Sequence, residues 1–208
     1  ARVLPFGVFL ALTLGQGFFG SAGRYWVYLA KTLVGVGLVW LVRPYVLEMR
    51  WKLSWEAVLA GVAVFAVWVG LNEHYPKLAT AGPAWNPNDR FGTGSGLAFL
   101  FVGVRILGST FVVPPIEEVF YRSFFYRYLV KNDFLSLRLG AFAWTPFLVT
   151  SAVFGFAHFE WLAGILCGLA YQGLVCWKGR LGDAMTAHAI TNFLLGLWVV
   201  YRGAWQFW

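Results

Sequence analysis

Charged side chains are scarce in this chain of 208 residues. Asp, Glu, Lys and Arg together make up 12% of it, whereas an ordinary soluble domain has about 25%. Hydrophobic residues account for 60% and aromatic residues for 20%. This composition argues against a soluble globular domain. Because long apolar stretches recur from end to end, we expect residues 1–208 to form a single integral-membrane domain without a soluble appendage.

Acidic residues are the scarcer of the two charges. The chain has 9 Asp and Glu against 16 Lys and Arg, which gives a formal net charge of +7. In a membrane protein such an excess of cations is typical of contacts with lipid headgroups. No basic run alternates with an exposed polar surface, as it does in nucleic-acid-binding proteins. We therefore expect the lipid bilayer as a partner, and no nucleic acid.

Several hydrolase motifs are missing as well. The sequence has no HExxH and no GxSxG, which argues against zinc membrane proteases and serine hydrolases of the common types. The two cysteines, Cys167 and Cys176, lie in one apolar run. At helical spacing they are about 13 Å apart, too far for a disulfide. We expect both to be small buried side chains.

Apolar runs are what the chain has in abundance. They cover residues 3–20, 25–42, 55–72, 97–115, 116–131, 146–158, 161–177 and 183–201. Several reach the roughly 20 residues that a bilayer requires, and others are shorter. In lipid the backbone must satisfy its own hydrogen bonds, so these runs are helices unless they close a barrel. Ten-residue segments in which apolar and polar residues strictly alternate, as in barrel strands, are absent. We therefore predict an all-α fold, a polytopic bundle of about eight transmembrane helices with a buried polar cavity.

Gly, Pro and charged residues separate the runs. The chain opens with Ala-Arg-Val-Leu-Pro and no basic region, so we expect its first run to be a genuine span and not a signal peptide. The connector 72–96 is long and polar, and we favour a plain linker over a lid; its His74 should face solvent. Gly164 and Gly168 form a GxxxG pattern, which allows a neighbouring helix to approach closely.

Three short pieces place polar groups within or against these apolar runs. They are Glu117–Arg122, Phe154–His158 and His188–Asn192. Ionisable groups inside membrane segments are costly and therefore indicate function. Together the three pieces supply two carboxylates, one guanidinium, two imidazoles and one carboxamide. These groups are sufficient to build a hydrolytic site.

The first piece contains a pair of glutamates. Pro114 and Pro115 predict the start of a helix, which would place both glutamates in its first turn. Glu118 and Arg122 are four residues apart and can pair. Glu117 lies about 100° further round the helix and is left free to act as a base. The alternative is that both glutamates cap a helix at the membrane surface while Arg122 reaches the headgroups.

The other two pieces also have structural interpretations. His158 at the end of its run is alternatively an interfacial residue or a helix-pairing donor. His188 and Asn192 are four residues apart on one helix face and alternatively join two helices. The occurrence of all three pieces in one chain favours a shared site. Glu160, two residues beyond His158, fits an interfacial cap better.

The ordered set EExxxR, FxxxH and HxxxN resembles the CPBP (Abi) family, which is named for type II CAAX prenyl endopeptidases and bacteriocin-processing enzymes. The resemblance covers about residues 97–200. The segment 114–124, the Asn86-Pro87 pair and the tail 203–208 are similar to a bacterial subgroup associated with exosortase systems. The resemblance implies an integral protein of the bacterial cytoplasmic membrane.

The resemblance also implies an activity and a set of roles. The activity is that of a glutamate-type intramembrane endopeptidase with a peptide or protein substrate. Glu117 would be the general base, and His158 would help to hold and activate the same water. His188 and Asn192 would stabilise the oxyanion. Two supporting residues would order the site, namely Glu118 and Arg122.

Other functions remain open at this point. A glutamate with two histidines is also an acceptable metal-ligand set. A metal-dependent hydrolase using Glu117, His158 and His188 is therefore an alternative to the expected absence of a cofactor. A non-catalytic membrane scaffold or immunity-type factor with the same fold is a second alternative. A transporter is a third, although the paired broken helices of inverted repeats are not apparent.

Overall fold

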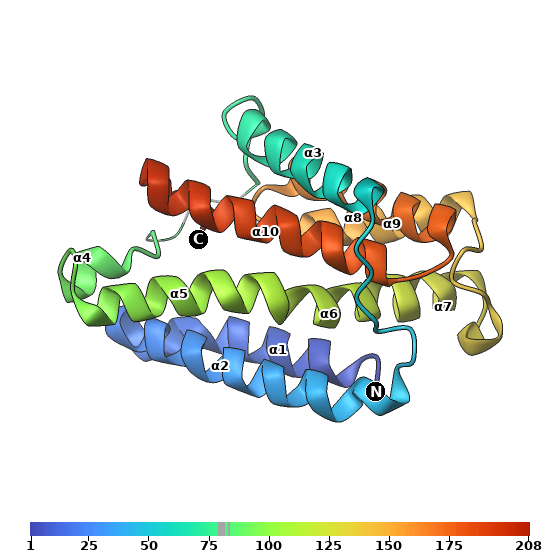
Figure 1. Ribbon diagram of the computed structural model, residues 1–208, viewed down its shortest axis with the longest axis horizontal. Coiled ribbons are helices and arrows are strands. Elements are labelled where there is room, and N and C mark those ends of the chain that lie inside the picture. The colour runs from blue at the N-terminus through green and yellow to red at the C-terminus, as the bar shows by residue number, and fades with distance from the viewer. Residues whose placement is uncertain (79–81, 83) are drawn as a thin grey trace.

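The computed structural model describes residues 1–78, 82 and 84–208, and all regular elements in these ranges are helical (Figure 1). Helices α5, α6 and α7 join through the π-helical segment Val119–Phe125 into one helix from Gly96 to Val130. Counted in this way, the described residues contain eight helices, which confirms the predicted all-α class. The individual bounds are α1 (Leu4–Gly15), α2 (Gly20–Val42), α3 (Trp55–Leu71), α4 (Pro87–Phe91), α5 (Gly96–Phe111), α6 (Val113–Glu118), α7 (Tyr126–Val130), α8 (Trp144–Phe156), α9 (Trp161–Lys178) and α10 (Gly182–Arg202).

Length and composition allow three of the described helices to cross a membrane: Gly23–Tyr45, Gly96–Val130 and Gly182–Arg202. Three shorter helices are also apolar, at Leu4–Phe19, Trp55–Leu71 and Trp144–Phe156. Large apolar side chains cover the outside of the bundle; Trp40, for example, is 72% exposed and Leu53 80%. Apolar surface of this extent requires a partner that removes it from water, and lipid is that partner for a bundle of apolar helices.

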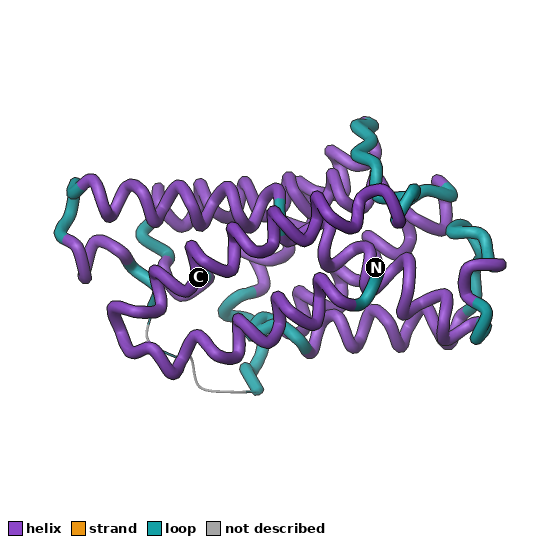
Figure 2. The backbone as a smooth tube through the Cα atoms, turned by 90° about the horizontal axis from the view of Figure 1, so that it is seen from below, coloured by secondary structure: helices purple, strands orange, loops and turns teal. Residues whose placement is uncertain are grey.

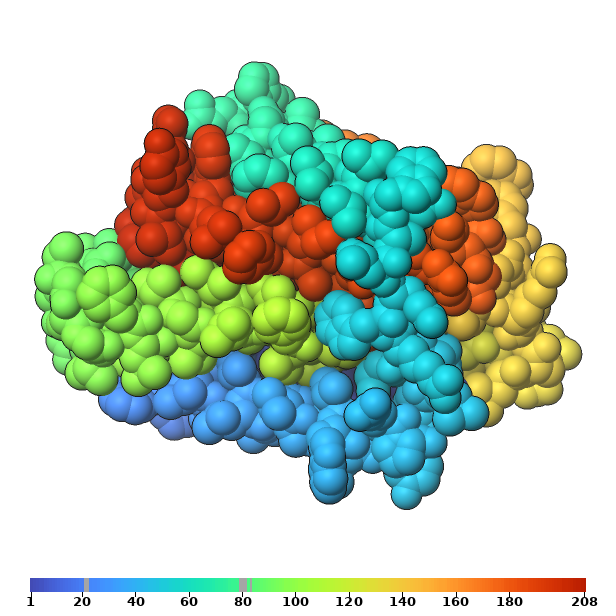
Figure 3. Space-filling view, viewed as in Figure 1, coloured from blue at the N-terminus to red at the C-terminus, as the bar shows by residue number. Residues whose placement is uncertain are grey.

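The long helix Gly96–Val130 runs through the middle of the bundle (Figure 1). Helices α1 and α2 pack on one side of it, and α10 packs on the other side together with α3. The space-filling view shows the same layers, from blue at one edge to red and cyan at the other (Figure 3). Most helices follow the long axis of the molecule (Figure 2). Segments from both halves of the sequence therefore meet at the central helix.

The expected helix start at the proline pair is confirmed in part: α6 begins at Val113, with proline in its first turn, but the placement of both glutamates in that turn is wrong. Val112 has helical dihedral angles, and its N–H bonds to the Gly108 carbonyl at 3.0 Å, so α5 runs on directly into α6. A proline within such a continuous helix lacks an N–H donor, and its ring crowds the carbonyl four residues earlier. The glutamates Glu117 and Glu118 consequently lie at the end of α6, in the interior of a long helix and not in a first turn.

Helices α8 and α9 are in close contact through small residues. A Cβ atom on Gly164 would lie 2.9 Å from the Cα of Gly155, and one on Gly168 would lie 2.9 Å from the Cα of Ser151. Real Cβ atoms essentially never come this close to backbone atoms. The close approach predicted from the GxxxG pattern is therefore present.

We expect Gly168→Ala to destabilise the protein by about 1–3 kcal/mol, since the added methyl group forces two packed backbones apart. Gly173→Ala is the matched control, because it lies on the same helix with nothing within 4 Å of its Cβ position. Alanine favours helix over glycine, so the control should be neutral or more stable. Thermal unfolding in detergent measures both, and equal melting temperatures for the two variants would contradict the packing argument.

The connector 72–96 differs from the plain linker that we expected. Trp85 is 4% exposed, and its ring centroid lies 4.5 Å from that of Tyr25 on α2. Tyr75 and Lys77 both donate hydrogen bonds to Glu160 at the start of α9. Residues 79–81 and 83 lie outside the described part. The described parts of the connector thus pack on the bundle, whereas His74 is exposed as predicted.

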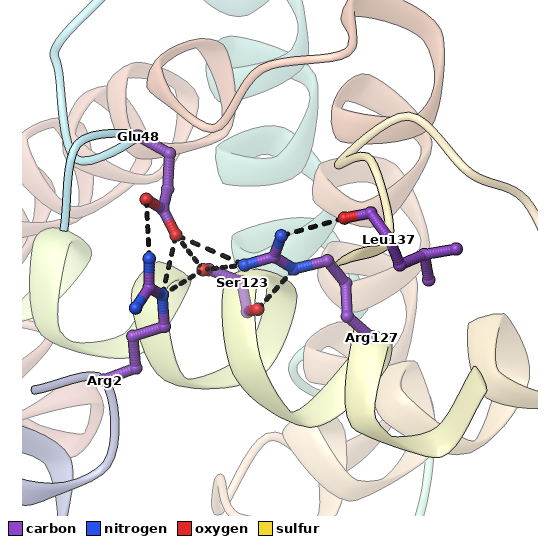
Figure 4. A network of polar contacts seen from close by, with 5 residues as sticks. All are labelled: Arg2, Glu48, Ser123, Arg127 and Leu137. Atoms are coloured by element: carbon purple, nitrogen blue, oxygen red, sulfur yellow. Dashed lines mark hydrogen bonds and ion pairs between the residues drawn. The ribbon is translucent and has the colours of Figure 1, made fainter. Parts of the chain in front are cut away.

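A polar network ties the loop after α2 to the central helix (Figure 4). Arg2 donates to both carboxylate oxygens of Glu48, at 2.8 and 3.0 Å. Ser123 donates to the same carboxylate, and Arg127 donates to it at 3.3 Å. Burial acts to raise the pKa of Glu48, but the hydrogen bonds from Arg2 and Ser123 outweigh it and hold the pKa below the ordinary value. The network therefore stabilises the fold while Glu48 is ionised.

This network predicts a pH-dependent stability. Because the pKa of Glu48 is lower in the folded state, its contribution is present above the unfolded pKa of about 4.3 and is lost as pH falls through the folded value. Wild-type protein should lose this stability on acidification. Glu48→Gln should be less stable than wild type at pH 7, and its stability should fall less between pH 7 and pH 3. Melting temperatures between pH 7 and pH 3 test this, with the exposed Glu73→Gln as control. Parallel curves for wild type and Glu48→Gln would refute the role of the network.

Candidate active site

A cavity of about 380 Å³ opens beside the central helix. Glu117 from α6, His158 from the turn after α8, and His188 and Asn192 from α10 all line it. Asn192 is anchored, because its Nδ2 donates to the Ser109 carbonyl at 2.8 Å. The structure thus brings the four residues predicted as catalytic to one cavity, although they lie as far apart as 75 positions in the sequence (117 to 192).

Glu118 and Arg122 form the ion pair that their spacing predicted. Arg122 Nε lies 3.2 Å from Glu118 Oε2, and both side chains are 0% exposed. The other carboxylate oxygen, Glu118 Oε1, accepts a hydrogen bond of 2.9 Å from His188 Nδ1. One carboxylate therefore bridges Arg122 on the central helix to His188 on α10. The contact with His188 was not predicted, because the sequence paired His188 only with Asn192.

The guanidinium of Arg122 is otherwise surrounded by aromatic rings. Its Cζ atom lies 4.4 Å from the ring centroid of Phe154 and 5.5 Å from that of Tyr121. Its Nη1 and Nη2 atoms are buried and have no hydrogen-bond partner among the described residues. Arg122 does not reach the lipid headgroups, so the alternative of a surface cap does not hold for it. The cation is held by Glu118 and by cation–π contacts.

Glu117 differs from its neighbour in having no such partner. Its Oε2 atom is buried and accepts no hydrogen bond in the described part of the chain. A carboxylate oxygen taken out of water without a donor is costly unless something in the cavity satisfies it. Glu117 is therefore the carboxylate in this site that is available to a water molecule or a substrate.

The orientation of His158 is fixed by its own helix. Its Nδ1 lies 2.7 Å from the Phe154 carbonyl, and because a carbonyl only accepts, Nδ1 carries the hydrogen. In the neutral imidazole Nε2 is then an acceptor. The ring of Trp68 from α3 packs edge-on against the imidazole, at 5.5 Å between centroids. His158 therefore offers one acceptor nitrogen to the cavity that it lines.

His188 is held from two directions. Besides its hydrogen bond to Glu118, its ring stacks on Tyr171 of α9 at 5.3 Å between centroids. Tyr171 itself donates to Thr191 Oγ1 at 2.7 Å. The carboxylate at Nδ1 fixes the orientation of the imidazole ring. His188 is thus held rigidly beside the cavity that it lines.

Sequence reasoning missed the cavity residues that lie outside the three motifs. Lys31 of α2 and Arg105 of α5 both line the cavity, together with Tyr28. Both are cations within apolar runs, and that alone indicates function. Cys167 and Glu160 line it as well. Glu160 is 5% exposed and bound by Tyr75 and Lys77, so it is more than an interfacial cap.

The described residues contain no group of three or more His, Cys, Asp or Glu side chains placed to hold a metal ion. In this arrangement Glu118 occupies Nδ1 of His188 and the Phe154 carbonyl occupies Nδ1 of His158. Each imidazole keeps only Nε2 for the cavity.

The apolar helical bundle with this polar cavity defines an integral membrane protein. Residues 99–194 match the family model described as type II CAAX prenyl endopeptidase Rce1-like. The match contains all three motifs and just under half of the chain. Comparisons with curated proteins and with solved structures gave no match.

Replacing Arg122 with Met should destabilise the protein by about 3–5 kcal/mol, because the buried Glu118 carboxylate loses its cation. Arg138→Met, at an exposed position, is the matched control and should unfold like the wild type. Thermal and denaturant unfolding in detergent compare the three proteins. An Arg122→Met protein of wild-type stability would show that the buried pair does not hold the fold.

Proposed function

We propose that the protein is an intramembrane endopeptidase in which Glu117 activates a water molecule for attack on a peptide bond. The observation that supports this most directly is the unpartnered Oε2 of Glu117, buried beside a cavity that His158 also lines. Glu117 is a carboxylate able to accept a proton, and His158 has an acceptor nitrogen that can orient the water. The match of residues 99–194 to the model of a protease family supports the same reaction class.

In this mechanism water donates one hydrogen bond to Glu117 and a second to Nε2 of His158. Glu117 takes the proton as the water oxygen attacks the carbonyl carbon, which gives a tetrahedral oxyanion. The protonated Glu117 then passes this proton to the leaving amine, and the C–N bond breaks. General base catalysis of this kind contributes on the order of 10²–10⁴ in rate.

The oxyanion requires donors that are already oriented. Asn192 has one Nδ2 hydrogen engaged by the Ser109 carbonyl and a second that is free for the cavity. His188 is held at Nδ1 by the Glu118 carboxylate, and its Nε2 donates to the oxyanion when the ring is protonated. Arg122 in turn fixes Glu118. Glu118 and Arg122 are thus positioning residues, because they act through His188.

A metal is not needed for any of these steps, and we propose a mechanism without one. For the substrate, the name of the matched family suggests a peptide that ends in a prenylated CAAX sequence. A peptide drawn from the bilayer fits the apolar surroundings of the cavity. For location, we propose the bacterial cytoplasmic membrane. The narrower resemblance to the exosortase-associated subgroup stays a prediction.

Glu117→Gln should remove nearly all hydrolysis while the protein remains folded, since Gln preserves the shape but cannot accept the water proton. Asn192→Ala should lower the rate by about 10²–10³, as expected for the loss of one oxyanion donor. The assay uses purified protein in liposomes with a farnesylated CAAX peptide and a pool of fluorescence-quenched apolar peptides. The exposed Glu73→Gln is the control and should cleave normally.

Chelator treatment separates this mechanism from the metal-dependent alternative. Cleavage should persist after prolonged incubation with EDTA or 1,10-phenanthroline. Complete inhibition that added zinc reverses would replace the proposed mechanism with a metal-dependent one. Undiminished cleavage by Glu117→Gln would overturn the assignment of Glu117.

A further inference from the structure

Two cations in the cavity take no part in the mechanism. Lys31 on α2 and Arg105 on α5 both line it, and these helices lie next to one another (Figure 1). Lys31 lies outside the segment that matches the family model. Among the described residues no ion pair joins either cation to an acid. The acids that share the cavity are Glu117 and Glu160, and Glu160 is already paired with Lys77.

Both cations lie against the same aromatic ring. Lys31 Nζ is 4.7 Å from the ring centroid of Tyr28, and Arg105 Cζ is 4.5 Å from it. The rings of Trp85 and Trp208 also face Arg105, at 4.9 and 5.7 Å. Two like charges are therefore held close together in an aromatic environment. Their mutual repulsion disfavours this arrangement unless an anion lies between them.

Lys31 is the more deeply buried of the two, with 5% of its surface exposed. Its one hydrogen bond goes to Thr13 Oγ1 at 3.1 Å, whereas an ammonium group has three donors. Cation–π contacts contribute a modest stabilisation, and burying an unpaired charge at membrane depth is costly. The aromatic rings therefore offset only part of the cost of burying this charge.

The position of Lys31 along its helix indicates which kind of anion can reach it. Within the membrane-crossing helix Gly23–Tyr45 it lies eight residues from one end and fourteen from the other, or about 12 and 21 Å along the axis. Both distances place Lys31 inside the roughly 30 Å of a bilayer core. A phosphate in the headgroup layer lies far from this depth, whereas a peptide that enters the cavity reaches it.

We propose that Lys31 and Arg105 form an anion-binding subsite for a carboxylate of the substrate peptide. This proposal rests on the proposed function in that its ligand is the peptide drawn into the same cavity. The carboxylate is either an Asp or Glu side chain or the free C-terminus, because both present the same group to the two cations. Bound there, it fixes how far the peptide extends past Glu117 and hence which bond is cleaved.

Binding tests this subsite independently of cleavage. The Glu117→Gln protein in phosphatidylcholine nanodiscs is titrated into three labelled peptides: acetyl-Phe-Leu-Val-Leu with a free carboxylate, the same peptide as its amide, and acetyl-Phe-Leu-Glu-Leu amide. Empty nanodiscs correct for partition into lipid. At least one carboxylate peptide should bind roughly 10- to 100-fold more tightly than the neutral amide, the range for a lost charged hydrogen bond. The one that does identifies the source of the carboxylate.

Variants attribute this preference to the two cations. Lys31→Met and Arg105→Gln should each abolish it, whereas the charge-preserving Lys31→Arg and Arg105→Lys should retain it. Lys52→Met and Arg138→Gln remove exposed cations and should bind like the parent protein. Equal binding of amide and carboxylate peptides, or a preference that survives both charge-removing variants, would overturn the proposal.

Two further outcomes are informative. If phosphatidylglycerol in the nanodiscs displaces the carboxylate peptide through Lys31 and Arg105, the cations bind lipid headgroups and the proposal is wrong. If the wild-type protein cleaves no peptide but the carboxylate preference is present and depends on both cations, the proposed function fails and the subsite stands.

Discussion

The bridge that Glu118 makes between Arg122 and His188 is the interaction on which the site depends. It joins the central helix to α10 with one fully buried carboxylate. Removing two ions from water is costly, and a buried ion pair is weak evidence for stability by itself. Its value here is positional, because the carboxylate fixes the ring of His188, while the neighbouring Glu117 keeps a buried Oε2 with no hydrogen-bond partner among the described residues. Two adjacent glutamates thus acquire different tasks from their environments.

The part of this arrangement that depends on helix periodicity was readable from the sequence. The spacing of Glu118 and Arg122 predicted their ion pair, and the offset of Glu117 predicted that it would be free. Apolar composition predicted the all-α class, because lipid leaves few ways to satisfy a backbone. The GxxxG pattern of α9 likewise predicted its close approach to a neighbour. In each case the sequence signal lies within one helix or follows from a general property of the bilayer.

Contacts between distant segments were not readable. The prolines at 114 and 115 indicated the start of α6, but not that α5 would run directly into it and place the glutamates inside a long helix. Lys31 and Arg105 drew no attention, because neither belongs to a motif and their common aromatic ring is visible only in three dimensions. The connector looked like a linker because its polar residues gave no sign that Trp85 is buried against α2. Periodicity does not reveal which helices become neighbours.

The central helix has a consequence for the choice of membrane. Its 35 residues span about 52 Å, well beyond the roughly 30 Å of a hydrocarbon core. Such a helix must tilt, or its ends must extend into the headgroups. Arg105 and Glu117 lie on it twelve residues apart, or about 18 Å, so tilt changes the depth of one relative to the other. The thickness of the bilayer therefore affects the depths at which these two residues lie. The length of the lipid acyl chains can change those depths without any direct contact with their side chains.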